Sequence, residues 1–127
     1  MIIRFLKQYW MSIVLCGVIL YLCMMDVRGL PKVHVSNFDK LVHFLMYAAV
    51  AGMVFFESSC YFRTSVSDIQ MLLGVLVFPI LFGGATELLQ EYCAPTRSGD
   101  WMDFLFDVYG VAAGFLVCYI INWKLKK

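Results

Sequence analysis

The sequence predicts an all-α membrane protein, a four-helix transmembrane bundle. Hydrophobic residues make up 62% of the 127 residues, charged residues only 15%, and the mean hydropathy is +0.80. Soluble domains average about 45–50% apolar and about 25% charged residues. Four apolar stretches approach the roughly 20 residues that a helix needs to cross a bilayer. Because these stretches do not alternate apolar and polar residues, helices are favoured over the strands of a β-barrel.

Composition and charge also exclude several classes of protein. The apolar fraction is too high for a soluble enzyme or a disordered regulator. The net charge of +1 leaves no basic face for nucleic acid and no charged tail, so we expect no nucleic-acid partner. At this length the chain is expected to form one domain over residues 1–127.

The four predicted spans cover approximately residues 9–25, 39–61, 69–90 and 103–122. The first contains no charge between residues 9 and 25. It is longer than the apolar region of a signal peptide, and no small-residue cleavage site follows it, so we expect a membrane helix. The second is a short apolar run that contains one histidine and needs extension at both ends. The third ends in the polar segment GGATELLQE, and the fourth already contains Asp107 near its start.

Four spans place both termini and the central loop on one side of the membrane. An excess of Lys and Arg marks the cytoplasmic side, so we expect both termini in the cytoplasm. Tyr and Trp near the span ends fit aromatic belts at the two interfaces. The basic residues are Arg4, Lys7, Arg63, Lys124, Lys126 and Lys127 on the predicted inner side, and Arg28, Lys32, Lys40 and Arg97 on the outer side.

Small residues predict close helix packing. Gly110 and Gly114 form a GxxxG pattern in the fourth span, and the second span contains an AAVAG segment at residues 48–52. Small residues let helices approach closely in lipid, and we expect this packing inside the bundle. The five cysteines show no CxxC or zinc-type spacing, so we expect small apolar packing residues rather than disulfides.

Ionisable residues inside the spans collect at the predicted outer end. Such residues cost about 2.5–3.5 kcal/mol at a helix centre, so they persist where they pair or line a wet cavity. Asp39, His43 and Tyr47 share one helix face at spacings of four residues, and Lys40 lies close to that face. Glu57, in contrast, belongs to the inner end, where we expect it only to border the membrane.

The third and fourth spans bring further polar residues to the same end. Glu87, Gln90 and Glu91 share one face of the third span. Asp100, Asp103 and Asp107 form one ridge at the start of the fourth, and Arg97 lies in the loop between these spans. We therefore expect a polar cluster in which three carboxylates, from Glu87, Asp103 and Asp107, meet His43.

Three interpretations of this cluster stay open. In the first, Lys40, His43 and Arg97 neutralise the carboxylates, and the charges only hold the helices together. In the second, the basic residues cradle a phosphate-bearing lipid headgroup, because arginine binds phosphate through two parallel hydrogen bonds. In the third, the three carboxylates and the histidine hold a divalent cation or supply a general base. Because no strict ligand motif such as HExxH is present, we predict no metal or cofactor.

An ordered set of motifs carries a family resemblance. The chain contains DKxxHF at residues 39–44, ExxQ at residues 87–90, then Arg97, Asp103 and Gly110. Over residues 38–114 this combination resembles the VanZ-like family, small bacterial membrane proteins named after a teicoplanin-resistance protein. The family pattern has an Asn where this chain has Asp107, so the site here is more acidic. The resemblance implies family site residues at Lys40, His43, Glu87, Gln90, Arg97 and Asp103.

The resemblance implies a bacterial inner-membrane protein and, for some members, an association with glycopeptide resistance, but no reaction. From the residues we expect an outward-facing pocket that engages an anionic, phosphate-bearing lipid headgroup, and the resemblance adds a cell-envelope precursor, such as a polyprenyl phosphate. A membrane hydrolase or transferase and a structural membrane partner are the alternatives, and the oligomeric state is open. The catalytic candidates are Glu87, His43 and Asp103, and the substrate-binding candidates are Lys40, Arg97, Gln90, Asp107 and Tyr47.

Overall fold

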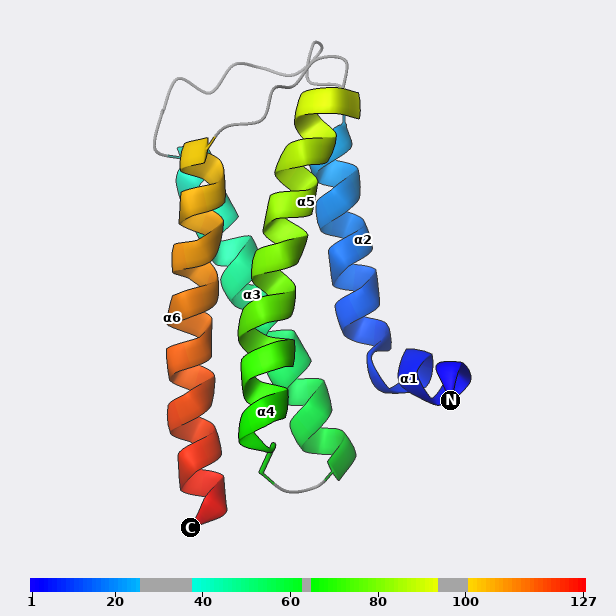
Figure 1. Ribbon diagram of the computed structural model, residues 1–127, viewed down its shortest axis with the longest axis vertical. Coiled ribbons are helices and arrows are strands. Elements are labelled where there is room, and N and C mark those ends of the chain that lie inside the picture. Colours follow the sequence, from blue (N-terminus) through cyan, green and yellow to red (C-terminus); the bar gives the residue numbers. More distant parts are fainter. Residues whose placement is uncertain (26–37, 63–64, 94–100) are drawn as a thin grey trace.

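The computed structural model describes residues 1–25, 38–62, 65–93 and 101–127, and these ranges contain helices and no strand (Figure 1). Its long helices run roughly along one axis, and both chain termini lie at the same end. The elements are α1 (Ile2–Gln8), α2 (Trp10–Met24), α3 (Phe38–Phe62), α4 (Asp68–Gln70), the π-helical segment η1 (Met71–Val77), α5 (Phe78–Cys93) and α6 (Trp101–Lys126).

The helices confirm a multi-pass membrane protein. Residues 40–60 of α3, the continuous helix 68–93 formed by α4, η1 and α5, and α6 are each long and apolar enough to cross a membrane. The α1–α2 pair meets this test only as one span bent by 76°. With 15 residues α2 rises about 22 Å, less than the roughly 30 Å hydrocarbon core. The described ranges therefore hold three spans, or four when the bent pair counts as one.

Glu57 of α3 links this helix to the start of α2. Its side chain is only 4% exposed and accepts hydrogen bonds from the backbone N–H groups of Met11, at 2.8 Å, and Ser12, at 3.1 Å, and from the Ser12 hydroxyl. The first N–H groups of a helix lack intrahelical partners, and a carboxylate there also suits the helix dipole. The expectation that Glu57 only borders the membrane is therefore wrong, because the fold buries it as the cap of α2.

Helices α3 and α6 pack closely through the predicted glycines. A β-carbon added at Gly110 would collide with the backbone carbonyl of Phe44, and one at Gly114 would lie 3.0 Å from the carbonyl oxygen of Ala48. In lipid, small residues at such a crossing allow the backbones to approach. The GxxxG pattern therefore serves packing inside the bundle, as predicted.

Asn122 of α6 holds the chain just before α4, at the end where the termini lie. Its Oδ1 accepts from the Val66 N–H at 2.7 Å, and its Nδ2 donates to the Val66 carbonyl at 2.9 Å. Both residues are almost fully buried, at about 1% exposure. This pair of bonds satisfies a buried backbone donor and acceptor that would otherwise be costly.

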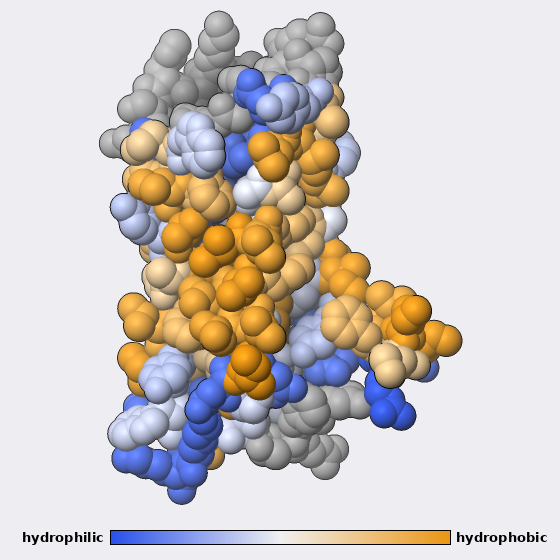
Figure 2. All heavy atoms as spheres, in the orientation of Figure 1, coloured by the Kyte–Doolittle hydropathy of each residue, from blue (hydrophilic) through white to orange (hydrophobic). Residues whose placement is uncertain are grey.

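Apolar side chains cover the middle of the bundle, and hydrophilic atoms gather towards its two ends (Figure 2). Large apolar residues such as Leu81 and Leu116 are 67% and 61% exposed. Such exposure fits a surface that faces lipid rather than water. All five cysteines are free; Cys23 and Cys118 are buried as expected of packing residues, whereas Cys60 and Cys93 are exposed.

Candidate functional site

The polar cluster lies at the end of the bundle away from the termini, where the first turns of α3 and α6 meet the last turns of α5 (Figure 1). His43, Glu87 and Asp107 are 6%, 8% and 0% exposed. The His43 Nδ1 lies 2.8 Å from the Asp107 Oδ1. With Asp107 ionised, its carboxylate accepts this bond, so Nδ1 carries the proton.

Asp107 is buried because α5 comes close to it at a glycine. A β-carbon at Gly83 would lie 3.3 Å from both Asp107 Oδ2 and the Tyr47 ring. Among the described residues, Asp107 Oδ2 is buried and makes no hydrogen bond. Buried polar atoms of this kind are rare in folded proteins and call for an explanation.

The second nitrogen of His43 faces the other acids. Its Nε2 lies 3.9 Å from the Asp103 Oδ2, and one ligand atom each from His43, Glu87 and Asp103 lie within 4.8 Å of one another. Asp103 is less buried than its two neighbours. The structure thus brings together four of the eight predicted site residues, one imidazole and three carboxylates.

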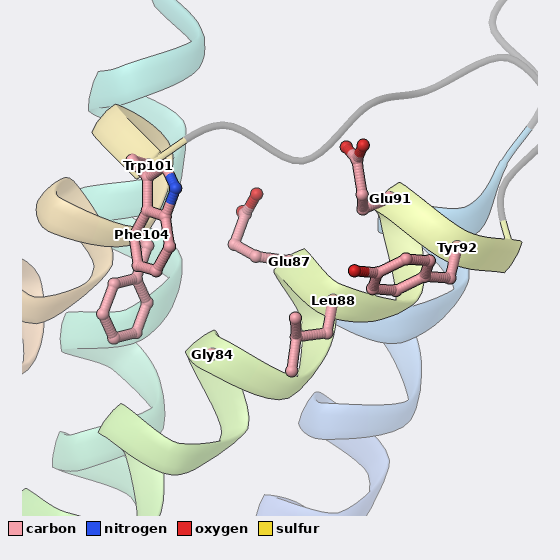
Figure 3. Close-up of a pocket in the computed structure, with 7 residues that line it drawn as sticks. All are labelled: Gly84, Glu87, Leu88, Glu91, Tyr92, Trp101 and Phe104. Carbon is pink, nitrogen blue, oxygen red and sulfur yellow. The ribbon is translucent and has the colours of Figure 1, made fainter.

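A cavity of about 500 Å³ opens beside this cluster, between α5 and α6. Glu87 belongs to both, and Figure 3 shows it pointing from α5 towards the side of Trp101 and Phe104. The walls are mainly apolar and aromatic, with two carboxylates, which is typical of a small-ligand site. The lining residues are Gly84, Glu87, Leu88, Glu91, Tyr92, Trp101 and Phe104.

The side chains of two predicted site residues make hydrogen bonds outside the cluster and the cavity. The Tyr47 side chain is fully buried, and its hydroxyl lies 2.7 Å from Thr86 Oγ1, which in turn donates to the Gly83 carbonyl at 2.8 Å. The Gln90 Nε2 donates to the Cys23 carbonyl at 3.0 Å and so ties α5 to α2. Both side chains support the walls of the site rather than lining the cavity.

Of the two predicted cations, the structure describes only Lys40, which lies apart from the cluster. The Lys40 Nζ lies 6.0 Å from the centre of the Phe106 ring, in a separate hollow that Leu41 and Phe44 also line. Arg97 lies outside the described residues. Within the described ranges, the cluster and cavity are therefore built from carboxylates, an imidazole and aromatic rings.

Sequence reasoning missed the cavity walls. Trp101 and Phe104 are not among the predicted site residues, although their spacing of three residues places them on one helix face. Gly84 was also overlooked, one turn before Leu88 and on the cavity side of α5. A small residue followed by Glu87 and Glu91 at helical spacing was the available signal.

The arrangement has the parts of a polar membrane site. It combines a buried imidazole with an assigned hydrogen-bond partner, two further carboxylates facing that imidazole, and an adjoining cavity with an amphipathic lining. Such groups suit binding of hydroxyl, ammonium or metal-bridged phosphate groups, and they could also exchange protons with a bound molecule.

Comparison with known proteins supports the motif evidence. The model of the family described as VanZ/LLP1 matches residues 2–122, beyond the 38–114 stretch on which the resemblance rests. No curated protein and no solved structure matches the chain. Because the match covers nearly the whole sequence and the helical membrane architecture agrees with it, the chain belongs to the VanZ/LLP1 family.

Proposed function

We propose that this VanZ/LLP1 protein engages the headgroup of an anionic membrane lipid or lipid-linked cell-envelope precursor, such as a polyprenyl phosphate. The observation that carries the proposal is the cavity between α5 and α6, which joins an aromatic wall to the buried Glu87. It lies near the end of the membrane spans, the depth at which headgroups meet acyl chains.

The lining favours a headgroup over a purely apolar ligand. Glu87 and Glu91 accept hydrogen bonds, so they suit hydroxyl or amine groups next to the phosphate. Trp101 and Tyr92 are 83% and 81% exposed at this end, as interfacial aromatic residues are. Leu88 and Phe104 offer apolar surface for the start of a lipid chain.

The phosphate itself needs a cation, because carboxylates repel it. The sequence supplies Arg97 between Cys93 and Trp101, the residues at which α5 ends and α6 begins. We assign Arg97 to the phosphate and Lys40 to a more distant contact on the outer surface of α3. Both assignments are part of the proposal and are tested by substitution.

A second function, a hydrolase or transferase that acts on the bound headgroup, is favoured by the bond between His43 and Asp107. An imidazole oriented by a carboxylate and facing two more acids is a common acid–base arrangement. Turnover of a phosphate-bearing lipid that disappears in Glu87→Gln, while headgroup binding persists, would place the protein in this class.

The test of the binding function is native mass spectrometry of the full chain released from a mild detergent, with defined lipids added. The lipids are a polyprenyl phosphate, phosphatidylglycerol and neutral diacylglycerol. We expect the wild type to retain the phosphate-bearing lipids. In Arg97→Ala, the affinity for these lipids should fall about tenfold or more, equal to about 1.4 kcal/mol.

A variant that fills the cavity and a matched control variant provide a second test of lipid binding. Leucine at Gly84 would occupy the cavity, because a β-carbon there only touches Phe104 at 3.5 Å and the rest of the side chain extends inward. Gly52→Leu is the control, since a β-carbon at Gly52 meets nothing within 4 Å. Equal lipid retention in the two leucine variants would contradict the proposal.

The same proposal extends to the cell. We place the protein in the bacterial inner membrane with both termini in the cytoplasm, so that the cavity faces outward to cell-envelope precursors. Any link to teicoplanin resistance would then act through the pocket. A strain that expresses the wild type should tolerate more teicoplanin than one that expresses Gly84→Leu, and equal tolerance would remove this link.

A further inference from the structure

The cluster of His43, Glu87 and Asp103 has the donor atoms and the spacing of a metal site. One ligand atom from each residue lies within 4.8 Å of the others. Atoms bound to one ion at about 2.0–2.2 Å in tetrahedral geometry lie about 3.3–3.6 Å apart, so the three atoms must approach one another by up to about 1.5 Å. Side-chain rotations of this size bring all three onto a single ion without moving a helix.

The histidine is already oriented for this role. With Asp107 ionised and the imidazole neutral, Nδ1 donates to Asp107 at 2.8 Å, and the lone pair of Nε2 lies on the side of Asp103. Metal-binding histidines commonly donate their other ring N–H to a carboxylate, which sets the tautomer and the ring orientation. Asp107, with no exposed surface, is such a partner.

The charge of the cluster also favours a cation. Glu87, Asp103 and Asp107 bring three carboxylates around one imidazole within the membrane-spanning part of the bundle. Among the described residues, the buried Asp107 Oδ2 makes no hydrogen bond, whereas the other carboxylate oxygen, Oδ1, accepts from His43. A nearby divalent ion would lower the cost of burying these charges.

We infer that His43, Glu87 and Asp103 bind one divalent transition-metal ion, and that Asp107 is a positioning residue for His43. One imidazole nitrogen and two carboxylates suit Mn²⁺ or Zn²⁺ better than Mg²⁺, which prefers oxygen ligands alone. Three protein ligands leave coordination positions for a further molecule. Glu87 also lines the cavity, so an ion bound by this carboxylate would lie beside the cavity. The inference does not depend on the lipid proposal.

The test measures metal binding by the full chain in detergent, without added lipid. Protein stripped with EDTA is dialysed against Mn²⁺, Zn²⁺ or Mg²⁺ alone, and the bound metal is counted by elemental mass spectrometry. Mn²⁺ affinity is then measured by electron paramagnetic resonance. We expect one Mn²⁺ or Zn²⁺ per chain, little Mg²⁺, and an affinity at least about tenfold weaker in Glu87→Gln and Asp103→Asn.

Two further variants separate ligands from structural residues. Asp68→Asn is the control, because Asp68 is an exposed carboxylate in α4, outside the cluster. It should bind metal as the wild type does. Asp107→Asn should weaken Mn²⁺ binding by about 10–100-fold, the range known for partners of metal-bound histidines, and should alter the manganese spectrum.

Far-UV circular dichroism and size-exclusion elution show which variants fold. Either Glu87→Gln or Asp103→Asn is sufficient to test the ligand set if the other variant does not fold. A wild type that binds neither Mn²⁺ nor Zn²⁺ would overturn the inference. So would equal affinity in Glu87→Gln, Asp103→Asn and Asp68→Asn. Metal binding without lipid retention would refute the proposed function but not the metal site. Lipid retention without metal binding would refute only the metal site.

Discussion

The contact between Gly110 and α3 allows a quantitative prediction for Gly110→Ala. A methyl group there would collide with the Phe44 carbonyl oxygen and would lie 2.9 Å and 3.0 Å from the carbonyl carbon and Cα of that residue. Close C–H···O contacts in proteins have carbon–oxygen distances of about 3.3–3.6 Å. Because the obstacle is backbone, α6 must move away from α3 by on the order of 1 Å, and we expect overpacking to cost about 1–3 kcal/mol.

Gly→Ala changes at two other glycines provide the stability effects with which Gly110→Ala is compared. Gly52→Ala meets nothing within 4 Å, so it should show only the helix-propensity gain of up to about 1 kcal/mol. Gly114→Ala meets the Ala48 carbonyl oxygen at 3.0 Å and the Ala51 side chain at 3.1 Å, so its cost should be intermediate. Since all three changes share the propensity term, the differences between them isolate the packing cost.

The assay is unfolding in mixed micelles titrated with SDS and followed by far-UV circular dichroism. We expect Gly52→Ala to be the most stable, then Gly114→Ala, with Gly110→Ala the least stable. If Gly110→Ala is as stable as Gly52→Ala, the close approach of α3 and α6 does not exist and the reasoning fails.

The same perturbation reaches the functional cluster. Gly110 lies three residues after Asp107, and Phe44 directly follows His43. Moving the helices apart at this level must lengthen the 2.8 Å bond between His43 and Asp107. Gly110→Ala should therefore also weaken Mn²⁺ binding, whereas Gly52→Ala should not.

Three other predictions concern the remaining contacts and the orientation. Glu57→Ala should destabilise the protein by about 1–3 kcal/mol, because α2 loses its cap. Glu57→Gln should destabilise it by less, because the amide keeps a hydrogen-bond acceptor. Unchanged stability of Glu57→Ala in micelle unfolding would contradict the cap. Asn122→Leu should cost about 1–3 kcal/mol and speed amide exchange at Val66, and an unchanged exchange rate would refute that contact. In spheroplasts, an impermeant maleimide should label the exposed Cys93 but not the exposed Cys60, and the reverse pattern would invert the predicted topology.

Much of the fold was predictable because its causes are local. Helical periodicity brings residues three or four apart onto one face, so Asp103 and Asp107 were expected to share a ridge and Glu87 to share a face with Gln90. Long apolar runs required helices, because backbone polar groups in lipid must bond within their own segment. The close packing at Gly110 also followed from residue size alone.

The directions of side chains between helices were not predictable in this way. Gln90 and Glu87 share a helix face, yet Gln90 bonds to α2 while Glu87 reaches the cavity and the cluster. Such a division depends on where the neighbouring helices lie. Lys40 is three residues before His43, but its ammonium group lies near the Phe106 ring.

The sequence by itself determined a helical membrane protein with acidic residues and a histidine at one end of its spans, because composition and helical spacing act within single segments. Only the tertiary structure decided that Asp107 bonds Nδ1 of His43, that Nε2 faces Asp103, and that Glu57 caps a helix 45 residues away in the chain. These contacts join separate helices. Their geometry depends on helix rotation and on the approach of backbones, which no single segment encodes.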